Sequence, residues 1–259
     1  MRARRIAAVA IAAVLLAAPA VAAGGPGNGV SRRTVLLGYS VNGRPIVAIE
    51  TGDFASTRKV LVVGCIHGTE CAGIVVARRL SRIAPPPGLD LWIVPDLNPD
   101  GHALFRRGNA HRVDLNRNFP WLWQPLKGFF KSGNAPLSAH EARIAYHLIL
   151  RLRPSVSIWF HQHADTVDDS QGDVTLEYTF AATAGLPMGP LVQEPGSAVT
   201  WANHCLPAAS AFVVELPAGR VDRPFEYRLA HAVIAAARAA PPGRPTLDPS
   251  CAPRAAEHR

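Results

Sequence analysis

A histidine and a glutamate three residues apart, His67 and Glu70, are the residues of this 259-residue chain whose types and spacing most directly suggest chemistry. They follow the apolar, β-branched run 60–64, which predicts a buried strand, and they precede a helical pattern that begins near Ala72. Open α/β sheets place their ligand sites at the carboxyl ends of strands. An imidazole nitrogen and a carboxylate oxygen suit a borderline-soft dication such as zinc, so this turn predicts part of a metal site that still needs a third ligand.

Two more polar residues belong to apolar runs later in the chain. His161 follows the strand-like run 155–160, and Glu215 lies inside the apolar run 211–216. A lone histidine at a strand end is more often structural than a ligand. A glutamate in a buried strand is costly unless it is paired or functional, so Glu215 is a candidate site residue. Many charged and amide groups between 101 and 120 indicate a binding loop, with an ordinary solvated loop as the alternative.

The elements that must position these residues alternate between strands and helices. Asn42-Gly43 lies between two alternating segments and predicts a hairpin at the sheet edge, since both central residues of a type I′ turn need positive φ. Ser138 and Glu141 have the spacing of a capping box at the start of a helix that runs to about Leu152. Residues 166–209 show no clear period. The predicted fold is a single α/β domain with a mixed, twisted sheet flanked by helices, completed by a strand over 89–94 and a helix over 223–240.

The first 23 residues have the composition of a secretory signal peptide. Arg2, Arg4 and Arg5 precede an apolar run over 6–18 that ends in small residues, and we predict cleavage after Ala22 or Ala23. A retained membrane anchor is the alternative, but a spanning helix needs about 20 apolar residues. The expected organisation is therefore a signal peptide at 1–23, one domain at 24–240 and a loose tail at 241–259 of a secreted bacterial protein without a stable membrane anchor.

The charge and cysteine content fit an exported protein. Loss of the signal removes three arginines and lowers the formal charge from +8 to +5, and the remaining basic residues are spread out, which disfavours nucleic-acid binding. The four cysteines allow three pairings of two disulfides in an oxidising compartment. Cys65 and Cys71 flank the His67 turn and could clip it, which would leave Cys205 for Cys251; buried free thiols are the alternative.

Six short motifs in the same order resemble the M14 zinc carboxypeptidases, and most closely their short bacterial branch of murein peptide amidases. They span residues 35 to 235 approximately, and each is weak alone. The motifs are HGTE at 67–70, NPDG at 98–101, RRGN at 106–109, DLNRNFP at 114–120, WFHQH at 159–163 and FVVELP at 212–217.

The resemblance implies a role for each matched residue. It implies that His67, Glu70 and His161 bind one zinc ion per chain and that Glu215 is the general base. Arg107 would polarise the scissile carbonyl and hold its oxyanion, and the pair Asn116 and Arg117 would grip a substrate's terminal carboxylate.

Several positions depart from the family pattern. Arg112 stands where the family usually has glycine, which predicts a shifted loop. His163, two residues after His161, is a second candidate ligand, disfavoured because it is expected to point to the opposite side of the strand. No residue matches the mobile tyrosine of larger members, and Val199 or Thr200 is expected to line the pocket for the substrate's last side chain.

The resemblance implies hydrolysis of an amide bond next to a free carboxylate, and the short branch together with the signal peptide favours murein peptides, such as the bond between D-glutamate and diaminopimelate. Two alternatives remain open. One is an N-acyl amino acid deacylase of the same fold, and the other is a wall-peptide binding module that does not cut. The oligomeric state cannot be predicted from these features.

Overall fold

The computed structural model describes residues 31–252, in which one eight-stranded sheet is combined with helices. The strands are β1 (Ser31–Tyr39), β2 (Pro45–Gly52), β3 (Lys59–Val63), β4 (Asp90–Val94), β5 (Val156–Gln162), β6 (Thr166–Asp168), β7 (Met188–Gly189) and β8 (Ser210–Leu216). The α-helices are α1 (Gly73–Leu80), α2 (Pro99–Ala103), α3 (His140–Leu152), α4 (Val174–Ala184), α5 (Ala198–Cys205) and α6 (Arg223–Ala239), and the 3₁₀ helices are η1 (Leu115–Arg117), η2 (Gly128–Phe130) and η3 (Pro249–Cys251).

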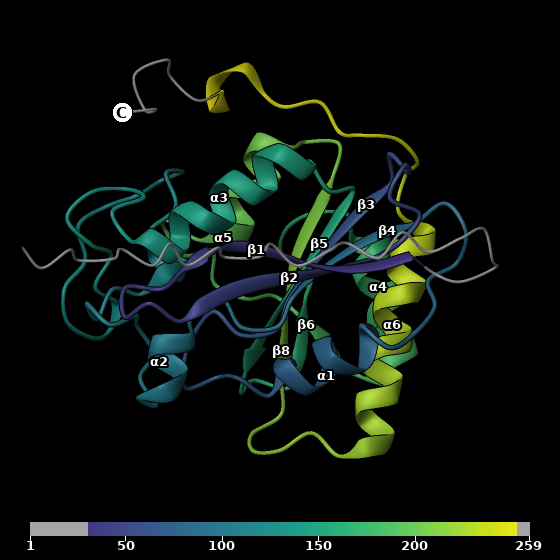
Figure 1. Cartoon of the computed structure of the whole chain (residues 1–259), viewed down its shortest axis with the longest axis horizontal. Coiled ribbons are helices and arrows are strands. Elements are labelled where there is room, and N and C mark those ends of the chain that lie inside the picture. The colour runs from purple at the N-terminus through teal and green to yellow at the C-terminus, as the bar shows by residue number, and fades with distance from the viewer. Residues whose placement is uncertain (1–30, 253–259) are drawn as a thin grey trace, which may run out of the picture.

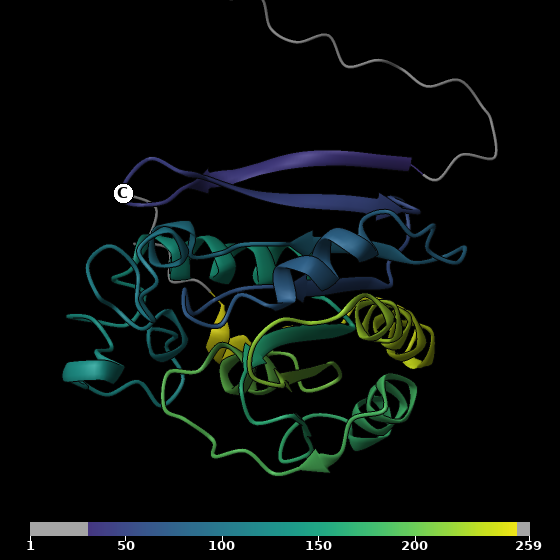
Figure 2. The same ribbon diagram turned by 90° about the horizontal axis from the view of Figure 1, so that it is seen from below.

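The sheet is mixed, in the order β1-β2-β4-β3-β5-β8-β6-β7. Its centre, β4-β3-β5-β8, is parallel, and antiparallel strands adjoin it on both sides. The hairpin of β1 and β2 lies along one border of the molecule, as the purple strands in Figure 2 show. The predicted α/β fold with a mixed sheet between helices is confirmed.

Helices cover both faces of the sheet because successive residues of the central strands point to opposite sides. On β3, Val60 and Val62 belong to the apolar core beneath α1, α4 and α6, whereas Leu61 and Val63 belong to the core beneath α3 and α5. Figure 1 shows α3 beside α5, and α4 beside α6. The four parallel strands therefore lie between two apolar cores, and polar loops follow their carboxyl ends.

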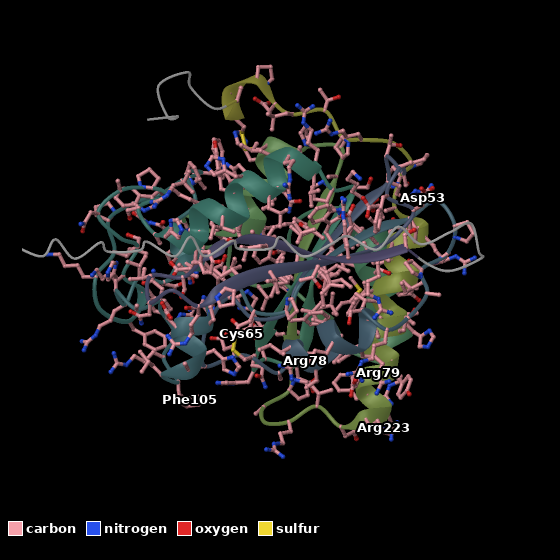
Figure 3. The ribbon with its side chains drawn as sticks, viewed as in Figure 1. Asp53, Cys65, Arg78, Arg79, Phe105 and Arg223 are labelled. Carbon is pink, nitrogen blue, oxygen red and sulfur yellow. A yellow bond between two sulfur atoms is a disulfide. The ribbon has the colours of Figure 1, made fainter. Side chains whose placement is uncertain are left out.

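An ion pair joins α1 to α6, two helices that share a face of the sheet. Arg79 on α1 donates to Glu226 on α6 at 2.8 Å, and its guanidinium lies 4.1 Å from the Tyr227 ring centroid. Figure 3 labels Arg78, Arg79 and Arg223 around α1 and the beginning of α6. Of the three, Arg78 and Arg223 are exposed, so Arg79 is the arginine that links the two helices.

The edge hairpin is confirmed, but its expected type I′ turn is wrong. Residues 40–44 form a longer connection in which the Gly43 N–H donates to the Ser40 carbonyl and Gly43, not Asn42, has positive φ. The Asn42 N–H instead donates to Asp100 of α2 at 2.9 Å. The contact with α2 sets the turn geometry, which the Asn-Gly pair alone does not encode.

The expected capping box at the start of α3 is also wrong. The N-cap is Ala139, without a side-chain hydrogen bond, and its N–H donates to the Asn118 side chain at 2.9 Å. Glu141 is fully buried and accepts hydrogen bonds from Asn109 at 2.7 Å and from the Val41 N–H at 3.3 Å. The glutamate thus joins α3 to two distant loops rather than closing its own helix.

Between 166 and 209, where the sequence shows no period, the structure contains β6, α4, β7 and α5. At the carboxyl end, Cys251 is bonded to Cys205, and Leu247 packs against the core. The predicted signal peptide at 1–23 lies outside the described residues, and the domain boundaries stay predictions. Within residues 31–252, no helix has both the length and the apolar character that crossing a bilayer requires.

Candidate functional site

The seven residues singled out from the sequence meet at one cavity at the carboxyl edge of the parallel strands. This cavity has a volume of about 210 Å³ and is lined mainly by polar side chains. Residues from β5, β8, the turn after β3 and the 107–117 loop supply its walls. The seven are His67, Glu70, Arg107, Asn116, Arg117, His161 and Glu215.

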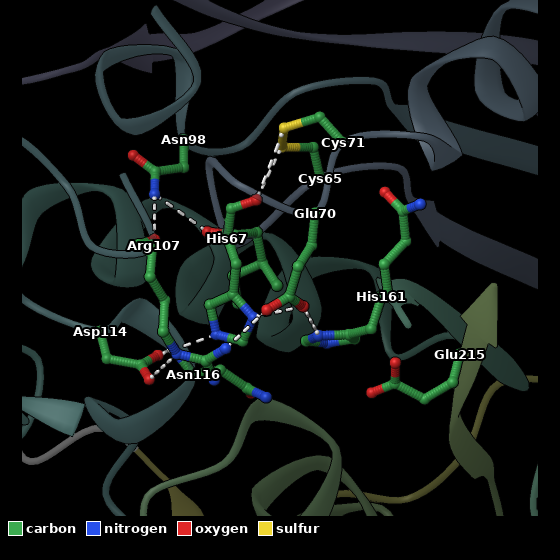
Figure 4. Close-up of polar contacts among 12 residues, drawn as sticks. Cys65, His67, Glu70, Cys71, Asn98, Arg107, Asp114, Asn116, His161 and Glu215 are labelled. Carbon is green, nitrogen blue, oxygen red and sulfur yellow. Dashed lines mark hydrogen bonds and ion pairs between the residues drawn. A yellow bond between two sulfur atoms is a disulfide. The ribbon is translucent and has the colours of Figure 1, made fainter. Parts of the chain in front are cut away.

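Three of these residues bring lone-pair atoms to one point. Glu70 Oε2 lies 2.9 Å from His67 Nδ1 and 3.0 Å from His161 Nδ1, as the dashed lines in Figure 4 show. Among residues 31–252, this is the one group of three His, Cys, Asp or Glu residues whose ligand atoms come within 4.8 Å of one another. A dication would satisfy all three groups at once, and the two-imidazole, one-carboxylate donor set fits zinc.

Asp114 fixes the tautomer of His67. Its Oδ1 lies 2.9 Å from His67 Nε2, and Asp114 is fully buried. Burial would raise the pKa of Asp114, but the neighbouring His67 and Arg107 charges outweigh it and hold the pKa well below its usual range. The ionised carboxylate accepts the Nε2 proton, so a neutral ring that gives up its Nδ1 hydrogen bond to Glu70 would offer the Nδ1 lone pair to a metal ion.

The ligand carboxylate itself is ionised. Burial alone would raise the pKa of Glu70, but the hydrogen bonds with His161 and His67 hold it well below its usual range. Burial lowers the pKa of His161, which favours the neutral ring. A charged carboxylate and a neutral imidazole are the forms of these residues that bind a metal ion.

Close backbone packing shapes the turn that carries His67 and Glu70. A Cβ on Gly68 would lie 2.0 Å from the Gly101 carbonyl carbon, so no side chain fits there. Asn98 donates through Nδ2 to the carbonyl oxygens of Ile66 at 3.0 Å and Arg107 at 3.1 Å. The HGTE and NPDG motifs are therefore two halves of one packed unit that also positions the Arg107 loop.

A disulfide encloses the same turn. Cys65 and Cys71 are bonded, which confirms the favoured pairing, and so is the second pair, Cys205 with Cys251. The Cys65 sulfur lies 3.3 Å from the His67 carbonyl oxygen. The clip ties Cys65, two residues after β3, to Cys71, two residues before α1, and it limits the conformations of the turn between them.

Arg107 is held by two carboxylates on the border of the cavity. Its Nη1 donates to Glu70 Oε1 at 2.6 Å, and its Nε donates to Asp114 Oδ2 at 2.8 Å. These bonds restrain the guanidinium from two directions. The arginine thus lies against the cluster of His67, Glu70 and His161 and presents a fixed positive charge to the cavity.

Asn116 and Arg117 belong to η1, which Asp114 caps by accepting the Asn116 N–H at 2.9 Å. Asn116 Oδ1 accepts the Ala198 N–H at 2.9 Å, so its amide nitrogen is the donor left for the cavity. Arg117 Nη2 lies 3.2 Å from Glu194, whose side chain is 40% exposed. An amide donor and a guanidinium next to each other suit a carboxylate ligand.

His161 and Glu215 reach the cavity from β5 and β8. Each side chain lies on the same face of its strand as the residue two positions earlier, which is Trp159 in β5 and Val213 in β8. Those two residues pack in the core with α3 and α5. His163 lies elsewhere, in a neighbouring pocket of about 770 Å³, and is not part of the three-ligand group. The preference for His161 over His163 agrees with this placement.

The sequence reasoning missed some of the site and misplaced other residues. Asp114 and Glu194 contact site residues but were not assigned a role from the sequence. For Asp114 a signal was present, because it belongs to the same motif as Asn116 and Arg117. Val199 and Thr200 are buried and are not among the cavity's lining residues, whereas Ser197 is. Arg112 has φ of +60°, the left-handed region that favours glycine, and the loop still delivers the residues that follow it to the cavity.

The sequence is similar to those of known proteins. The family profile Peptidase_M14, described as zinc carboxypeptidase, matches residues 88–168. Murein peptide amidase A of Escherichia coli strain K12 is 28% identical over 191 residues, covering 66% of this chain and 78% of that protein. The protein of the same name from Vibrio campbellii is 29% identical over 209 residues, covering 74% of this chain and 82% of its own.

Solved structures share the fold. Carboxypeptidase A from Helicoverpa armigera superposes with a TM-score of 0.69 at 18% identity, covering 80% of this chain and 68% of that chain. The murein-tripeptide amidase MpaA from Escherichia coli O157 superposes with a TM-score of 0.66 at 24% identity, covering 82% of this chain and 94% of that chain. At these identities the superpositions establish the architecture alone.

Proposed function

We propose that this chain, which matches the M14 zinc carboxypeptidase profile over residues 88–168 and resembles murein peptide amidases, is a secreted hydrolase that cuts an amide bond next to a free carboxylate in murein peptides. The bond between D-glutamate and diaminopimelate is the proposed substrate. The observation that carries the proposal is the meeting of a three-ligand metal cluster, two arginines, an amide and a further glutamate at one cavity.

The metal site is assigned to His67, Glu70 and His161. The two Nδ1 atoms and the Glu70 carboxylate already converge, and the buried Asp114 orients the first imidazole. A zinc ion bound there would lower the pKa of a water molecule towards about 7 and polarise the scissile carbonyl. The protein's part is to hold the ligands in this arrangement with a charged Glu70.

Glu215 is assigned as the general base. It lines the same cavity as the metal cluster and accepts a long hydrogen bond from the Ala164 N–H at 3.4 Å. Its carboxylate would take the proton from the attacking water and then give it to the leaving amine. One side chain on the rigid strand β8 can therefore serve both halves of the hydrolysis.

Arg107 is assigned to the oxyanion. Its Nε and Nη1 are committed to Asp114 and Glu70, so Nη2 is the nitrogen that we assign to the developing negative charge on the carbonyl oxygen. A donor that is already fixed needs little reorganisation during the reaction. The two carboxylates thus keep the guanidinium in place before substrate arrives.

Asn116 and Arg117 are assigned to the substrate's free carboxylate. Glu194 now faces Arg117 Nη2, and its half-exposed side chain can move away when a substrate carboxylate arrives. The leaving amino acid of the proposed bond, diaminopimelate, carries such a carboxylate next to its amine. The pair of donors would therefore place the scissile bond by holding the residue on its leaving side.

The predicted signal peptide supports a murein substrate. The signal-like segment 1–23 would send the protein to the compartment where murein lies, and two disulfides are typical of proteins in an oxidising environment. The mature protein would carry a net charge of +5 by the formal count. Its proposed partners are murein peptides, with no nucleic acid and no stable membrane anchor.

The experiment is mass spectrometry of L-Ala-γ-D-Glu-meso-diaminopimelate incubated with the zinc-loaded mature protein and, in parallel, with Glu215→Gln. Release of free diaminopimelate by the wild type alone supports the reaction, the substrate and the assigned base together. Parallel assays with a C-terminal peptide and an N-acyl amino acid test the other hydrolases of this fold. If the wild type cuts none of the three, the proposed function is wrong.

A further inference from the structure

Two adjacent aromatic side chains lie exposed beside the two site arginines. Phe129 and Phe130 of η2 are 69% and 44% exposed. The Arg107 Cζ lies 5.3 Å from the Phe129 ring centroid and 5.4 Å from that of Phe130. The Arg117 Cζ lies 5.2 Å from the Phe130 centroid. Phe130 therefore contacts both guanidinium groups through one ring.

The loop that carries these rings is anchored to the site's own segment. The Asp114 N–H donates to the Lys131 carbonyl at 2.8 Å, and Asn118 Nδ2 donates to the Ser132 carbonyl at 2.6 Å. Ser132 is fully buried, and its hydroxyl accepts the Leu126 N–H at 2.8 Å. The base of the loop is thus fixed on both sides of η1, so the rings have a defined position over the arginines.

The two arginines differ in how firmly other groups restrain them. Arg107 is held by two carboxylates, whereas Arg117 has a buried Nε without a hydrogen-bond partner in the described structure. Arg117 relies on the Asn116 carbonyl at 3.0 Å and on Glu194, the partner that a substrate carboxylate would displace. Once Glu194 has moved, the Phe130 ring is a contact that still restrains the guanidinium.

We propose that Phe130 is a positioning residue, whose ring holds Arg117 in the orientation that receives the substrate's carboxylate. The negative face of an aromatic ring attracts a guanidinium, and the planar groups can stack. The same ring lies within 5.4 Å of both like-charged groups, Arg107 and Arg117. This inference rests on the proposed function, because it gives Arg117 a carboxylate to bind.

The test compares variants that separate ring character from bulk. Phe130→Leu keeps an apolar side chain without the ring, and Phe130→Tyr keeps the ring. A cation–π contact of ordinary strength corresponds to about 3- to 30-fold in affinity. We expect Phe130→Leu to raise KM for the murein tripeptide by such a factor with kcat changed less than threefold, and Phe130→Tyr to remain within twofold of wild type.

Phe129→Leu is the matched control, because its ring contacts Arg107, which two carboxylates already fix. We expect its KM to stay within twofold of wild type. Titration calorimetry with meso-diaminopimelate, the proposed product, gives a readout that needs no turnover. Its Kd should weaken in Phe130→Leu by the same factor as KM, while zinc content and thermal midpoint stay unchanged.

Three results would overturn the inference. They are equal KM and Kd in wild type and Phe130→Leu, equal losses in the leucine and tyrosine variants, and an effect confined to kcat. If the wild type is active and Phe130→Leu matches it, the inference alone is wrong. If the wild type neither cuts the tripeptide nor binds diaminopimelate, the murein assignment and the inference fall together.

Discussion

His161 of β5 and Glu215 of β8 are paired residues of two hydrogen-bonded parallel strands. Paired residues of a sheet send their side chains to the same face, so the third metal ligand and the assigned base stand next to each other by register alone. A shift of either strand by one residue would turn one of the two side chains into the opposite core. The strand pairing therefore links metal binding to proton transfer.

This relationship predicts that the two functions separate on mutation. Glu215→Gln should keep zinc and lower kcat by about 10²–10⁴-fold, the usual contribution of a general acid–base residue. His161→Ala should lose zinc at micromolar protein concentration. Metal content by atomic emission, measured beside kcat, checks both. Loss of zinc from Glu215→Gln would show that this carboxylate is a ligand instead.

Asp114→Asn should weaken zinc binding by about 10- to 100-fold, the usual cost of losing a partner that orients a ligand. An asparagine can still accept from His67 Nε2, but its amide nitrogen would then face the Arg107 Nε donor. Competition with a chromophoric chelator measures the affinity. Asp100→Asn, which changes a buried carboxylate of α2 that accepts from Asn42 and Arg44 of the hairpin turn, is the control that should leave zinc affinity unaltered.

We expect Glu177 to make the free energy of unfolding depend on pH, independently of the site chemistry. Its side chain is fully buried with both oxygens unpartnered in the described structure. Burial, followed by the charges of Asp168, Asp169 and Asp173, raises its pKa from 4.5 to about 8. The folded state then keeps a proton that the unfolded state releases, so this contribution to stability is complete below pH 4.5 and is lost as the pH rises through about 8.

The check is urea unfolding of wild type and Glu177→Gln from pH 5 to pH 9. The stability of the variant relative to wild type should rise with pH, by at most about 1.4 kcal/mol per pH unit, and level off above the folded-state pKa. A difference that does not vary with pH would mean that Glu177 is ionised in the folded protein.

The disulfides should differ in what they support. Replacing Cys205 and Cys251 with serine removes a link across 46 residues and should lower the unfolding free energy by about 2–4 kcal/mol with kcat/KM within twofold. Replacing Cys65 and Cys71 opens a link across 6 residues that encloses His67 and Glu70. That pair should weaken zinc affinity more than stability, which chelator competition and urea unfolding measure side by side.

The sequence predicts those parts of the molecule that are encoded locally. The apolar runs over 60–64, 89–94, 155–160 and 211–216 became the parallel centre of the sheet, because continuous β-branched runs suit strands buried on both faces. Their polar ends then had to meet at one edge. The grouping of His67, Glu70 and His161 at one cavity follows from this topology.

Tertiary contacts decided the features that sequence reasoning missed. Glu141 matches a capping box, yet it is fully buried and accepts its hydrogen bonds from Asn109 and from the Val41 N–H, which lie in distant parts of the chain. The α4 helix has apolar residues around its whole circumference, so its sequence shows no amphipathic period, although the helix packs against α6. Glu194 meets Arg117 from 77 positions away, a distance no local pattern conveys.

The clip between Cys65 and Cys71 also bears on which metal the turn selects. If the disulfide were reduced, the two cysteines would place thiol groups beside His67 and Glu70. Soft sulfur ligands favour copper(I) and zinc bound through sulfur. Bonded to each other, the sulfurs have no thiolate to offer. Oxidation therefore leaves nitrogen and oxygen as the donors of this turn, so metal discrimination would depend on the disulfide being closed before the ion arrives.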